Sequence, residues 1–191
     1  VLVLIFSLQS WTKADDIRDF QIEGMSIGDS ALDYFSIDEI KKALKHNSQR
    51  KGYIYPNRKY YTARLINFEK FETYDKVLLT FRDKDDKFKI YHLMGVIDYK
   101  NNFSNCFTQL NFIEKSIDNL NINAKKNKRT YNHPADPSEK SEITQIEYNF
   151  TTGEVIMASC ADWSKEMNIM DALRVEIQSK IFVEYLLKIY H

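Results

Sequence analysis

The segment from Tyr74 to Tyr99 constrains the fold of this chain more than any other part of the sequence. It contains two runs rich in β-branched, aromatic and large apolar residues, 76–81 and 88–97, separated by the charged hexapeptide Arg-Asp-Lys-Asp-Asp-Lys. Runs of this composition favour strands, and the hexapeptide between them is too polar to bury. The segment therefore predicts an antiparallel hairpin, and the rest of the chain can be placed as additions to its sheet.

Other strands and helices are predicted on both sides of this hairpin from periodicity and capping residues. Ser36 and Glu39 have the spacing of a capping box, which predicts a helix that runs to about Lys45. The other long helices are predicted at 104–121 and 180–190, and the other strands at 17–23, 59–68, 143–150, 155–160 and 173–177. Segments 46–56 and 123–141 lack a clear period and are predicted to be loops.

The order of these elements favours an α+β fold. Strands and helices come in blocks, and short turns join consecutive strands, which favours antiparallel pairing over parallel crossovers. We expect a single α+β domain over residues 15–191, built on an antiparallel sheet of about six strands with helices packed mainly on one face. The two covering helices are those predicted at 104–121 and 180–190.

The N-terminal residues 1–8, Val-Leu-Val-Leu-Ile-Phe-Ser-Leu, form an apolar run that is followed by a polar stretch. The run is too short to span a bilayer but fits the apolar region of a secretory signal, with Thr12 and Ala14 as the small residues before a cleavage site. A buried first strand is the alternative. We expect residues 1–14 to be the remnant of a signal peptide. The mature chain would begin at Asp15, have no transmembrane segment, and be exported to the periplasm or secreted.

The two cysteines, Cys106 and Cys160, are expected to form one disulfide. An exported chain with two cysteines most simply pairs them, because oxidising compartments favour such bonds. Cys106 lies on the apolar stripe of the helix predicted at 104–121, so its side chain faces the core, where a strand cysteine can meet it. Two buried free thiols are the alternative.

Charge composition argues against one broad class of partner. Lys and Arg together number 27, and so do Asp and Glu. This balance leaves no long-range positive field to attract nucleic acid or acidic membranes. We therefore expect no nucleic-acid partner.

Two segments contain residue types that hydrolases use, but neither has a complete set of partners. Gly28-Asp29-Ser30 resembles the start of the GDSL hydrolases, yet no Asp precedes any of the four histidines by three residues, as that family's Asp-x-x-His requires. His133, Asp136 and Ser138, with Ser141, can be written as a base, an acid and nucleophiles. They share a proline-containing loop without the strand-turn-helix elbow that would fix their geometry, so turn formation is the alternative.

No metal or cofactor is expected. A zinc site needs three or four ligands at characteristic spacings. The four scattered histidines and the two paired cysteines do not provide such spacings. No other motif in the sequence has the partners that a cofactor site requires.

Three aromatic residues are the candidates for binding a ligand. Trp163 follows the strand of Cys160 and stands among polar residues, where it can roof a small polar pocket; packing over the disulfide is the alternative. Tyr60 and Tyr91 lie on predicted strands. As exposed aromatics on a sheet face or edge without helices, they can hold a peptide or a small apolar ligand.

Two resemblances add to this interpretation. The sequence Asp-Phe-Gln-Ile-Glu-Gly-Met-Ser-Ile-Gly-Asp-Ser at 19–30, with Asp-Trp-Ser-Lys at 162–165, resembles an uncharacterised family of small exported proteins of marine alphaproteobacteria. That resemblance covers most of the chain and implies export, but it implies no activity. The element order over 22–99 resembles the modules of the outer-membrane assembly lipoprotein BamE and the β-lactamase inhibitor protein, although the chain has no lipobox cysteine near its start.

Together these observations predict a non-enzymatic exported binding or envelope-associated protein. Its partner would be a peptide, a small apolar ligand or an envelope protein. A small hydrolase that uses the 133–141 loop is the alternative function.

Overall fold

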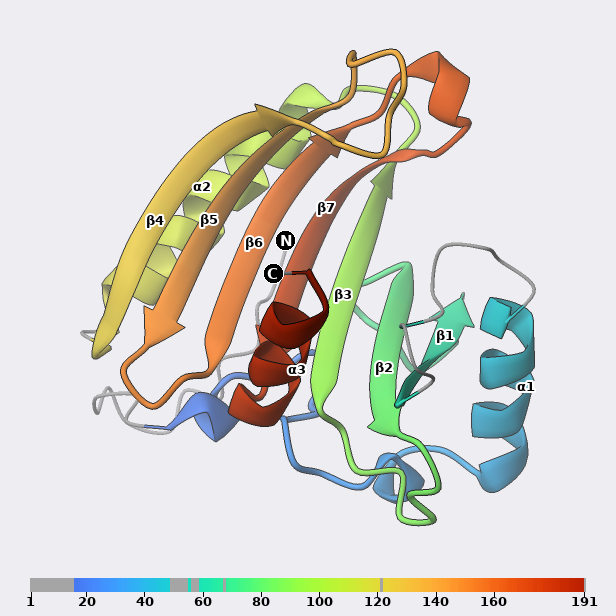
Figure 1. Cartoon of the computed structure of the whole chain (residues 1–191). Helices are drawn as coiled ribbons and strands as arrows, with labels where there is room; N and C mark the ends of the chain where they lie inside the picture. Colours follow the sequence, from blue (N-terminus) through green and yellow to red (C-terminus); the bar gives the residue numbers. More distant parts are fainter. Residues whose placement is uncertain (1–15, 49–54, 56–58, 67, 121, 191) are drawn as a thin grey trace.

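The computed structural model describes residues 16–48, 55, 59–66, 68–120 and 122–190. Within these residues the chain forms seven strands in one open antiparallel sheet and three α-helices (Figure 1). The strands are β1 (Tyr60–Ile66), β2 (Lys76–Arg82), β3 (His92–Tyr99), β4 (Ala124–Asn132), β5 (Glu142–Phe150), β6 (Val155–Asp162) and β7 (Asp171–Gln178). The α-helices are α1 (Ile37–Ser48), α2 (Ser104–Asp118) and α3 (Lys180–Tyr190). The predicted α+β class and the antiparallel sheet are confirmed, with seven strands instead of about six.

Two meanders make up the sheet, whose strand order is β1-β2-β3-β7-β6-β5-β4. Strands β1 to β3 form the first meander, strands β4 to β7 form the second, and α2 connects them. The last strand, β7, returns to the middle of the sheet and pairs with β3 from His92↔Gln178 to Tyr99↔Asp171. This pairing places side chains from distant parts of the sequence next to one another.

The predicted hairpin is present as β2 and β3. Strand β3 begins at His92, four residues later than predicted, because residues 88–90 pair with the N-terminal segment. The Ala31 N–H donates to the Phe88 carbonyl at 3.0 Å, and Phe88 has a left-handed backbone with φ of 47°. The chain turns there from one pairing to the other.

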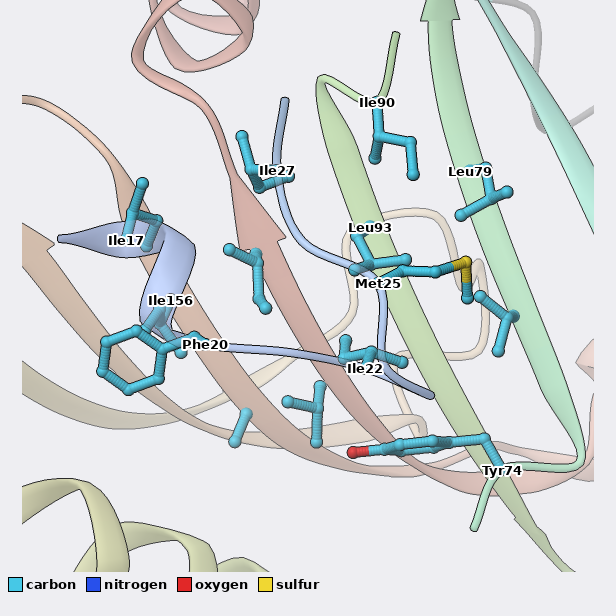
Figure 2. Packing of buried hydrophobic residues seen from close by; sticks show 14 of the residues in the cluster. Ile17, Phe20, Ile22, Met25, Ile27, Tyr74, Leu79, Ile90, Leu93 and Ile156 are labelled. Carbon is cyan, nitrogen blue, oxygen red and sulfur yellow. The ribbon is translucent and has the colours of Figure 1, made fainter. Parts of the chain in front are cut away.

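Apolar side chains of the N-terminal segment pack against the sheet (Figure 2). The prediction of a strand at 17–23 is wrong. Residues Ile17–Asp19 form a 3₁₀ helix, and Ile22 pairs with Met25 across a tight turn. The buried side chains of this segment are Ile17, Phe20, Ile22, Met25 and Ile27. The apolar residues of this segment are therefore explained by their burial against the sheet and not by strand pairing.

Glu23 anchors this segment to the loop before β2. Its backbone is left-handed, with φ of 52°, and its carboxylate accepts three consecutive backbone N–H groups. These belong to Glu72, Thr73 and Tyr74, at 2.9, 2.8 and 2.9 Å. The contact fixes the backbone at Tyr74, whose ring lies over Gly95 of β3.

Replacing Gly95 with alanine is expected to destabilise the fold by about 1–3 kcal/mol. The added Cβ would lie 2.5 Å from the Tyr74 ring, closer than packed atoms approach. Urea denaturation measures the change in the free energy of unfolding. In a Tyr74→Ala background the same substitution should cost much less, and an equal cost in both backgrounds would contradict the contact.

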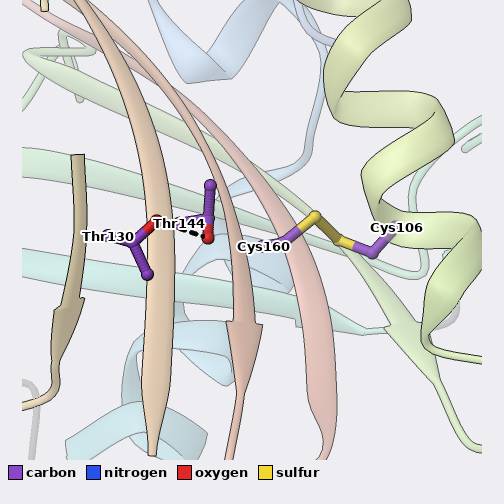
Figure 3. Close-up of a disulfide and its surroundings, with 4 residues drawn as sticks. All are labelled: Cys106, Thr130, Thr144 and Cys160. Atoms are coloured by element: carbon purple, nitrogen blue, oxygen red, sulfur yellow. Dashed lines mark hydrogen bonds between the residues drawn. A yellow bond between two sulfur atoms is a disulfide. The ribbon is translucent and has the colours of Figure 1, made fainter. Parts of the chain in front are cut away.

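The predicted disulfide between Cys106 and Cys160 is confirmed (Figure 3). It joins α2 to the sheet strand β6, with the two Cα atoms 5.9 Å apart. Both cysteines are buried, at 0% and 1% exposure. The disulfide therefore fixes α2 on the sheet face that the N-terminal segment also covers.

The helices α2 and α3 lie on opposite faces of the sheet, so the prediction that both pack on one face is wrong (Figure 1). Cys106 of α2 bonds to β6 on one face. Phe182 of α3 packs on the other, with its ring parallel to that of His92 at 5.0 Å between centroids. The amphipathic pattern of a helix requires an apolar partner but does not specify which face of a sheet supplies it.

Strand β4 occupies part of the segment 123–141 that was predicted to be a loop, and that prediction is wrong for its nine residues. β4 is an edge strand exposed along most of its length, so it lacks the apolar alternation that identifies strands. Pairing with β5 and contacts with α2 stabilise it. Thr130 and Thr144 hydrogen-bond across β4 and β5 at 3.0 Å (Figure 3), and the Lys126 ammonium lies 2.7 Å from the Glu114 carboxylate of α2.

Two predictions fall outside the part of the chain that the structure describes. These are the signal-peptide remnant at 1–14 and most of the loop at 46–56. Over the described residues, no helix combines the length and the apolar character needed to cross a membrane.

Candidate functional site

The side of β4, β5 and β6 that faces away from α2 carries no helix of the described structure (Figure 1). One row of side chains on this side crosses four strands, since Arg129, Gln145, Ser159 and Arg174 are successive partners in the sheet register. Gln145 and Ser159 are buried, Arg174 is half-buried and Arg129 is exposed. We call this row, together with the half-buried Met157, the open sheet face. It places uncharged polar groups between two arginines.

Trp163 closes one end of the open sheet face. Its side chain is 8% exposed and packs with Ile143 and Ala161. The Arg174 guanidinium carbon lies 5.2 Å from the centre of the Trp163 ring, a cation–π contact, and the His133 ring lies 4.7 Å away. Trp163 therefore does not pack over the disulfide, which lies on the other side of the sheet.

His133 is uncharged at neutral pH. Burial lowers the pKa of its imidazole, the positive charge of Arg174 lowers it further, and Asp136 opposes the shift. The Ala135 N–H donates to its Nδ1 at 3.2 Å, so Nδ1 carries no proton. Arg174 is thus the charged group beside Trp163.

The loop that contains the predicted hydrolase residues is organised around the Asp136 carboxylate. It accepts the Ser138 hydroxyl at 2.8 and 2.9 Å and the Ser141 hydroxyl at 2.6 Å, as well as both backbone N–H groups of these serines at 2.9 Å. The His133 imidazole makes no hydrogen bond to either serine hydroxyl among the described contacts, because its ring packs on Trp163, and only its backbone N–H donates to the Ser141 carbonyl, at 2.8 Å. His133, Asp136 and Ser138 therefore lie in one loop without forming a base–nucleophile pair.

Asp136 is expected to make stability depend on pH. The Ser141 hydroxyl bond, opposed by burial and reinforced by the Ser138 bonds, holds the Asp136 pKa well below its usual range. A carboxyl with a depressed pKa in the folded state stabilises the fold fully above its unfolded pKa of about 4, and this contribution is lost progressively as the pH falls from there to its folded pKa. Asp136→Asn should therefore lower the melting temperature most at neutral pH, by an amount that starts to shrink as the pH falls below about 4 and continues to shrink as the pH is lowered further.

Thermal unfolding across this pH range measures the effect. Asp86→Asn is the matched control, because Asp86 is exposed in the turn between β2 and β3. A melting-temperature difference for Asp136→Asn that does not change with pH would contradict the role of its charge.

A second set of groups, which was not predicted, lies where β1, β2, β3 and β7 meet under α3. The Thr62 hydroxyl hydrogen-bonds the Thr80 hydroxyl at 2.9 Å, Thr80 bonds His92 Nδ1 at 3.2 Å, and His92 Nε2 bonds Glu176 at 3.1 Å. The order hydroxyl, imidazole, carboxylate is that of a catalytic triad. Thr80 is completely buried, however, and Phe182 stacks on His92. No substrate can reach this hydroxyl in the structure.

Glu176 is ionised in this network. Burial alone would raise the pKa of its carboxyl, but the His92 hydrogen bond, the charge of Arg174 and the Gln178 amide outweigh burial and lower it. The carboxylate thus accepts from His92 at 3.1 Å and from Gln178 at 3.3 Å. The network joins β3 to β7 beneath α3, a structural role.

Tyr60 and Tyr91 do not form the exposed aromatic surface that was predicted. Tyr60 is 1% exposed and packs under α3 against Phe182 and Tyr185, at 5.2 and 4.8 Å between ring centroids. Tyr91 is half-buried and lies edge-on to Tyr60 at 5.6 Å. The expectation of an exposed Tyr60 is wrong, because α3 covers the face on which the tyrosine lies.

The segment 28–30 has a structural role in the observed fold. The Ser30 hydroxyl accepts the Leu32 N–H at 3.2 Å, which caps a 3₁₀ helix, and donates to the Lys87 carbonyl at 2.6 Å. The Asp29 carboxylate accepts from the Tyr34 hydroxyl at 2.7 Å. These bonds explain the Gly-Asp-Ser sequence by its structural role, without a catalytic one.

The described residues were also compared with the requirements of a metal site and of a ligand pocket. Among the described side chains, no group of three or more His, Cys, Asp or Glu residues is placed to hold a metal ion. One recess of about 430 Å³ lies between α1 and β1, and one of about 400 Å³ lies beside Asp75 and Asp98. Both are open to solvent and lie away from Trp163.

Sequence reasoning identified Trp163 and missed Arg174, Ser159 and Met157. Arg174 and Glu176 alternate with apolar residues in β7, and this alternation in the sequence could have predicted the polar face of the strand. It does not reveal that β6 and β7 are neighbours in this register.

Comparisons of the chain with protein-family models, with curated proteins and with solved structures found no match. The two family resemblances therefore remain predictions.

Proposed function

We propose that this chain is an exported, non-enzymatic binding protein that takes its ligand on the open sheet face. The observation that carries the proposal is the row of side chains from four strands, with Trp163 packed against its Arg174, on a part of the sheet without a covering helix of the described structure. An ordinary solvated sheet face is mainly charged. This one combines a buried Trp with buried Gln145 and Ser159.

The chemistry of the other candidate groups supports binding over catalysis. The Ser138 and Ser141 hydroxyls are held by Asp136, and the Thr80 hydroxyl is buried beneath α3. Each of these hydroxyls lacks either a base or access to a substrate. The geometry therefore favours the binding role over the hydrolase that would use the 133–141 loop.

The disulfide supports export. Disulfides persist in oxidising compartments such as the bacterial periplasm and the extracellular space. A buried bond between Cys106 and Cys160 fits a protein that folds there.

The ligand class follows from the side chains present. The half-buried Tyr131 and Met157 offer apolar surface, and Arg174 and Ser159 offer polar groups that hydrogen-bond no described residue, whereas Gln145 already bonds Tyr131 and Glu147. A peptide, either free or within an envelope protein, or a small apolar ligand with a polar end matches this combination.

The test is a thermal-shift screen of envelope peptides and periplasmic metabolites against the wild type and two variants. Met157→Glu places a carboxylate on the open sheet face. Phe112→Glu makes the same change at a 49% exposed apolar residue of α2, on the other side of the sheet. We expect at least one ligand to raise the melting temperature of the wild type and of Phe112→Glu but not of Met157→Glu.

A panel of hydrolase substrates tests the alternative function. Turnover that is lost in both His133→Ala and Ser138→Ala would overturn the proposal in favour of the hydrolase. A ligand shift that Met157→Glu leaves intact would place the binding site elsewhere.

A further inference from the structure

We infer that Arg174 and Ser159 bind a carboxylate group of the ligand at the centre of the open sheet face. The inference rests on the proposed function and adds the chemical class that the face recognises. The evidence for this inference is that two hydrogen-bond donors, the Arg174 guanidinium and the Ser159 hydroxyl, have no acceptor in the described structure and lie next to the Trp163 ring.

The Arg174 guanidinium is held in position but has no hydrogen-bonded acceptor among the described residues. It lies over the Trp163 ring at 5.2 Å, a contact that restrains a long side chain. It forms neither an ion pair nor a side-chain hydrogen bond with any described residue. A guanidinium offers five N–H donors in a planar fork that matches the two oxygens of a carboxylate.

The carboxylates in the next row of this side of the sheet are already engaged by other groups. Glu176 accepts from His92 and Gln178, at 3.1 and 3.3 Å. Glu147 accepts from Gln145 and Asn149, at 3.0 and 2.6 Å. Arg174 is thus close enough to Glu176 for its charge to lower the pKa of that carboxyl, but its N–H groups hydrogen-bond no acceptor among the described residues.

Ser159 supplies the second donor. It is the direct register partner of Arg174 across β6 and β7, so the two side chains leave the sheet on the same side and next to each other. Ser159 is 8% exposed, and its hydroxyl makes no hydrogen bond to a described group. A carboxylate that meets the guanidinium from above the sheet can accept this hydroxyl with the same oxygen.

The surrounding charges favour a carboxylate over a phosphate. Glu176 and Glu147 lie one row away on the same side of the sheet, across Met157 in the register. Their negative charge opposes a dianion more strongly than a monoanion. One guanidinium and one hydroxyl match the single charge and two oxygens of a carboxylate.

Trp163 lies directly beneath Arg174 and provides a signal for the experiment. Its Nε1–H is buried and has no acceptor in the described structure. A ligand that contacts Arg174 also alters the environment of the ring beneath it. The indole N–H resonance of Trp163, assigned with Trp163→Phe, therefore reports occupancy of this site.

The experiment is an NMR titration of the full chain with three probes: N-acetylphenylalanine, its amide and phenyl phosphate. We expect the acid to bind roughly ten- to hundred-fold more tightly than the amide, and more tightly than phenyl phosphate. Arg174→Gln should abolish the preference for the acid, and Ser159→Ala should weaken acid binding by roughly three- to ten-fold. Arg82→Gln, at an exposed arginine of β2, should change nothing.

The outcomes separate this inference from the proposed function. Acid and amide that bind equally, with shifts on the open sheet face, would overturn the carboxylate site and leave the binding function standing. Phenyl phosphate that binds as tightly as the acid would show an unselective anion site and overturn the inference. No binding of the acid would also overturn it, and the thermal-shift screen then decides the proposed function separately. Amide spectra of each variant that match the wild type away from the substitution show that the variants are folded.

Discussion

Removing the Cys106–Cys160 disulfide is expected to lower the free energy of unfolding by as much as about 4 kcal/mol. The bond closes a loop with a sequence separation of 54, and without it the unfolded chain regains the conformational entropy of that loop. For a chain of this length the loss corresponds to a decrease in melting temperature of roughly 8–16 °C. Both cysteines are buried between α2 and β6, so the double alanine variant also loses some packing.

Urea denaturation of the wild type and of the double variant Cys106→Ala/Cys160→Ala, with and without a reductant, measures this effect. The reductant should destabilise the wild type and leave the double variant unchanged. The circular-dichroism spectrum of the double variant should remain that of an α+β fold. Two titratable thiols in denatured, unreduced protein from an oxidising host would contradict the disulfide.

Phe182→Ala is expected to destabilise the protein by about 3–5 kcal/mol. Phe182 is 1% exposed, stacks on His92 at 5.0 Å and meets the Tyr60 ring edge-on at 5.2 Å. Together with Tyr185, it packs α3 on the sheet. Its removal leaves a cavity and uncovers the hydrogen bond between His92 and Glu176.

The neighbouring Ile181 provides a matched control, because it is 53% exposed on the same helix. Ile181→Ala should change the free energy of unfolding by less than about 0.5 kcal/mol. Limited proteolysis should cut α3 of the Phe182→Ala variant faster than α3 of the control. Equal stabilities for the two variants would contradict the packing of α3 against this face.

The sequence was sufficient where local patterns determine structure. The reciprocal bonds of Ser36 and Glu39, at 2.7 and 3.3 Å between backbone N–H and side chain, start α1 as predicted. The central hairpin, the strand at β7 and the cysteine pair were also predicted, because composition and alternation specify them. In each case the partner is near in sequence or is the other cysteine of the chain.

The sequence was insufficient where partners are distant or exposed. Strand β4 is held by pairing with β5 and by acidic residues of α2, so its own residues carry no apolar alternation. The face that α3 covers depends on the turn after β7, where the Ser179 N–H donates to the Tyr91 carbonyl at 2.9 Å. Neither partner can be identified from periodicity alone.

The candidate site shows the same division. Trp163 was recognised from its residue type and polar surroundings. Arg174 and Ser159 become partners only through the register of β6 and β7, and His92 meets Glu176 across a sequence separation of 84. A single sequence does not supply those pairings, so the open sheet face emerges only from the fold.

A chemical-shift map of the backbone amides shows whether a ligand binds on the open sheet face. The ligand is the one that gives the largest thermal shift in the screen. We expect the perturbed amides to cluster at Gln145, Met157, Ser159, Trp163 and Arg174. A cluster on α2, or at the recess between α1 and β1, would contradict it.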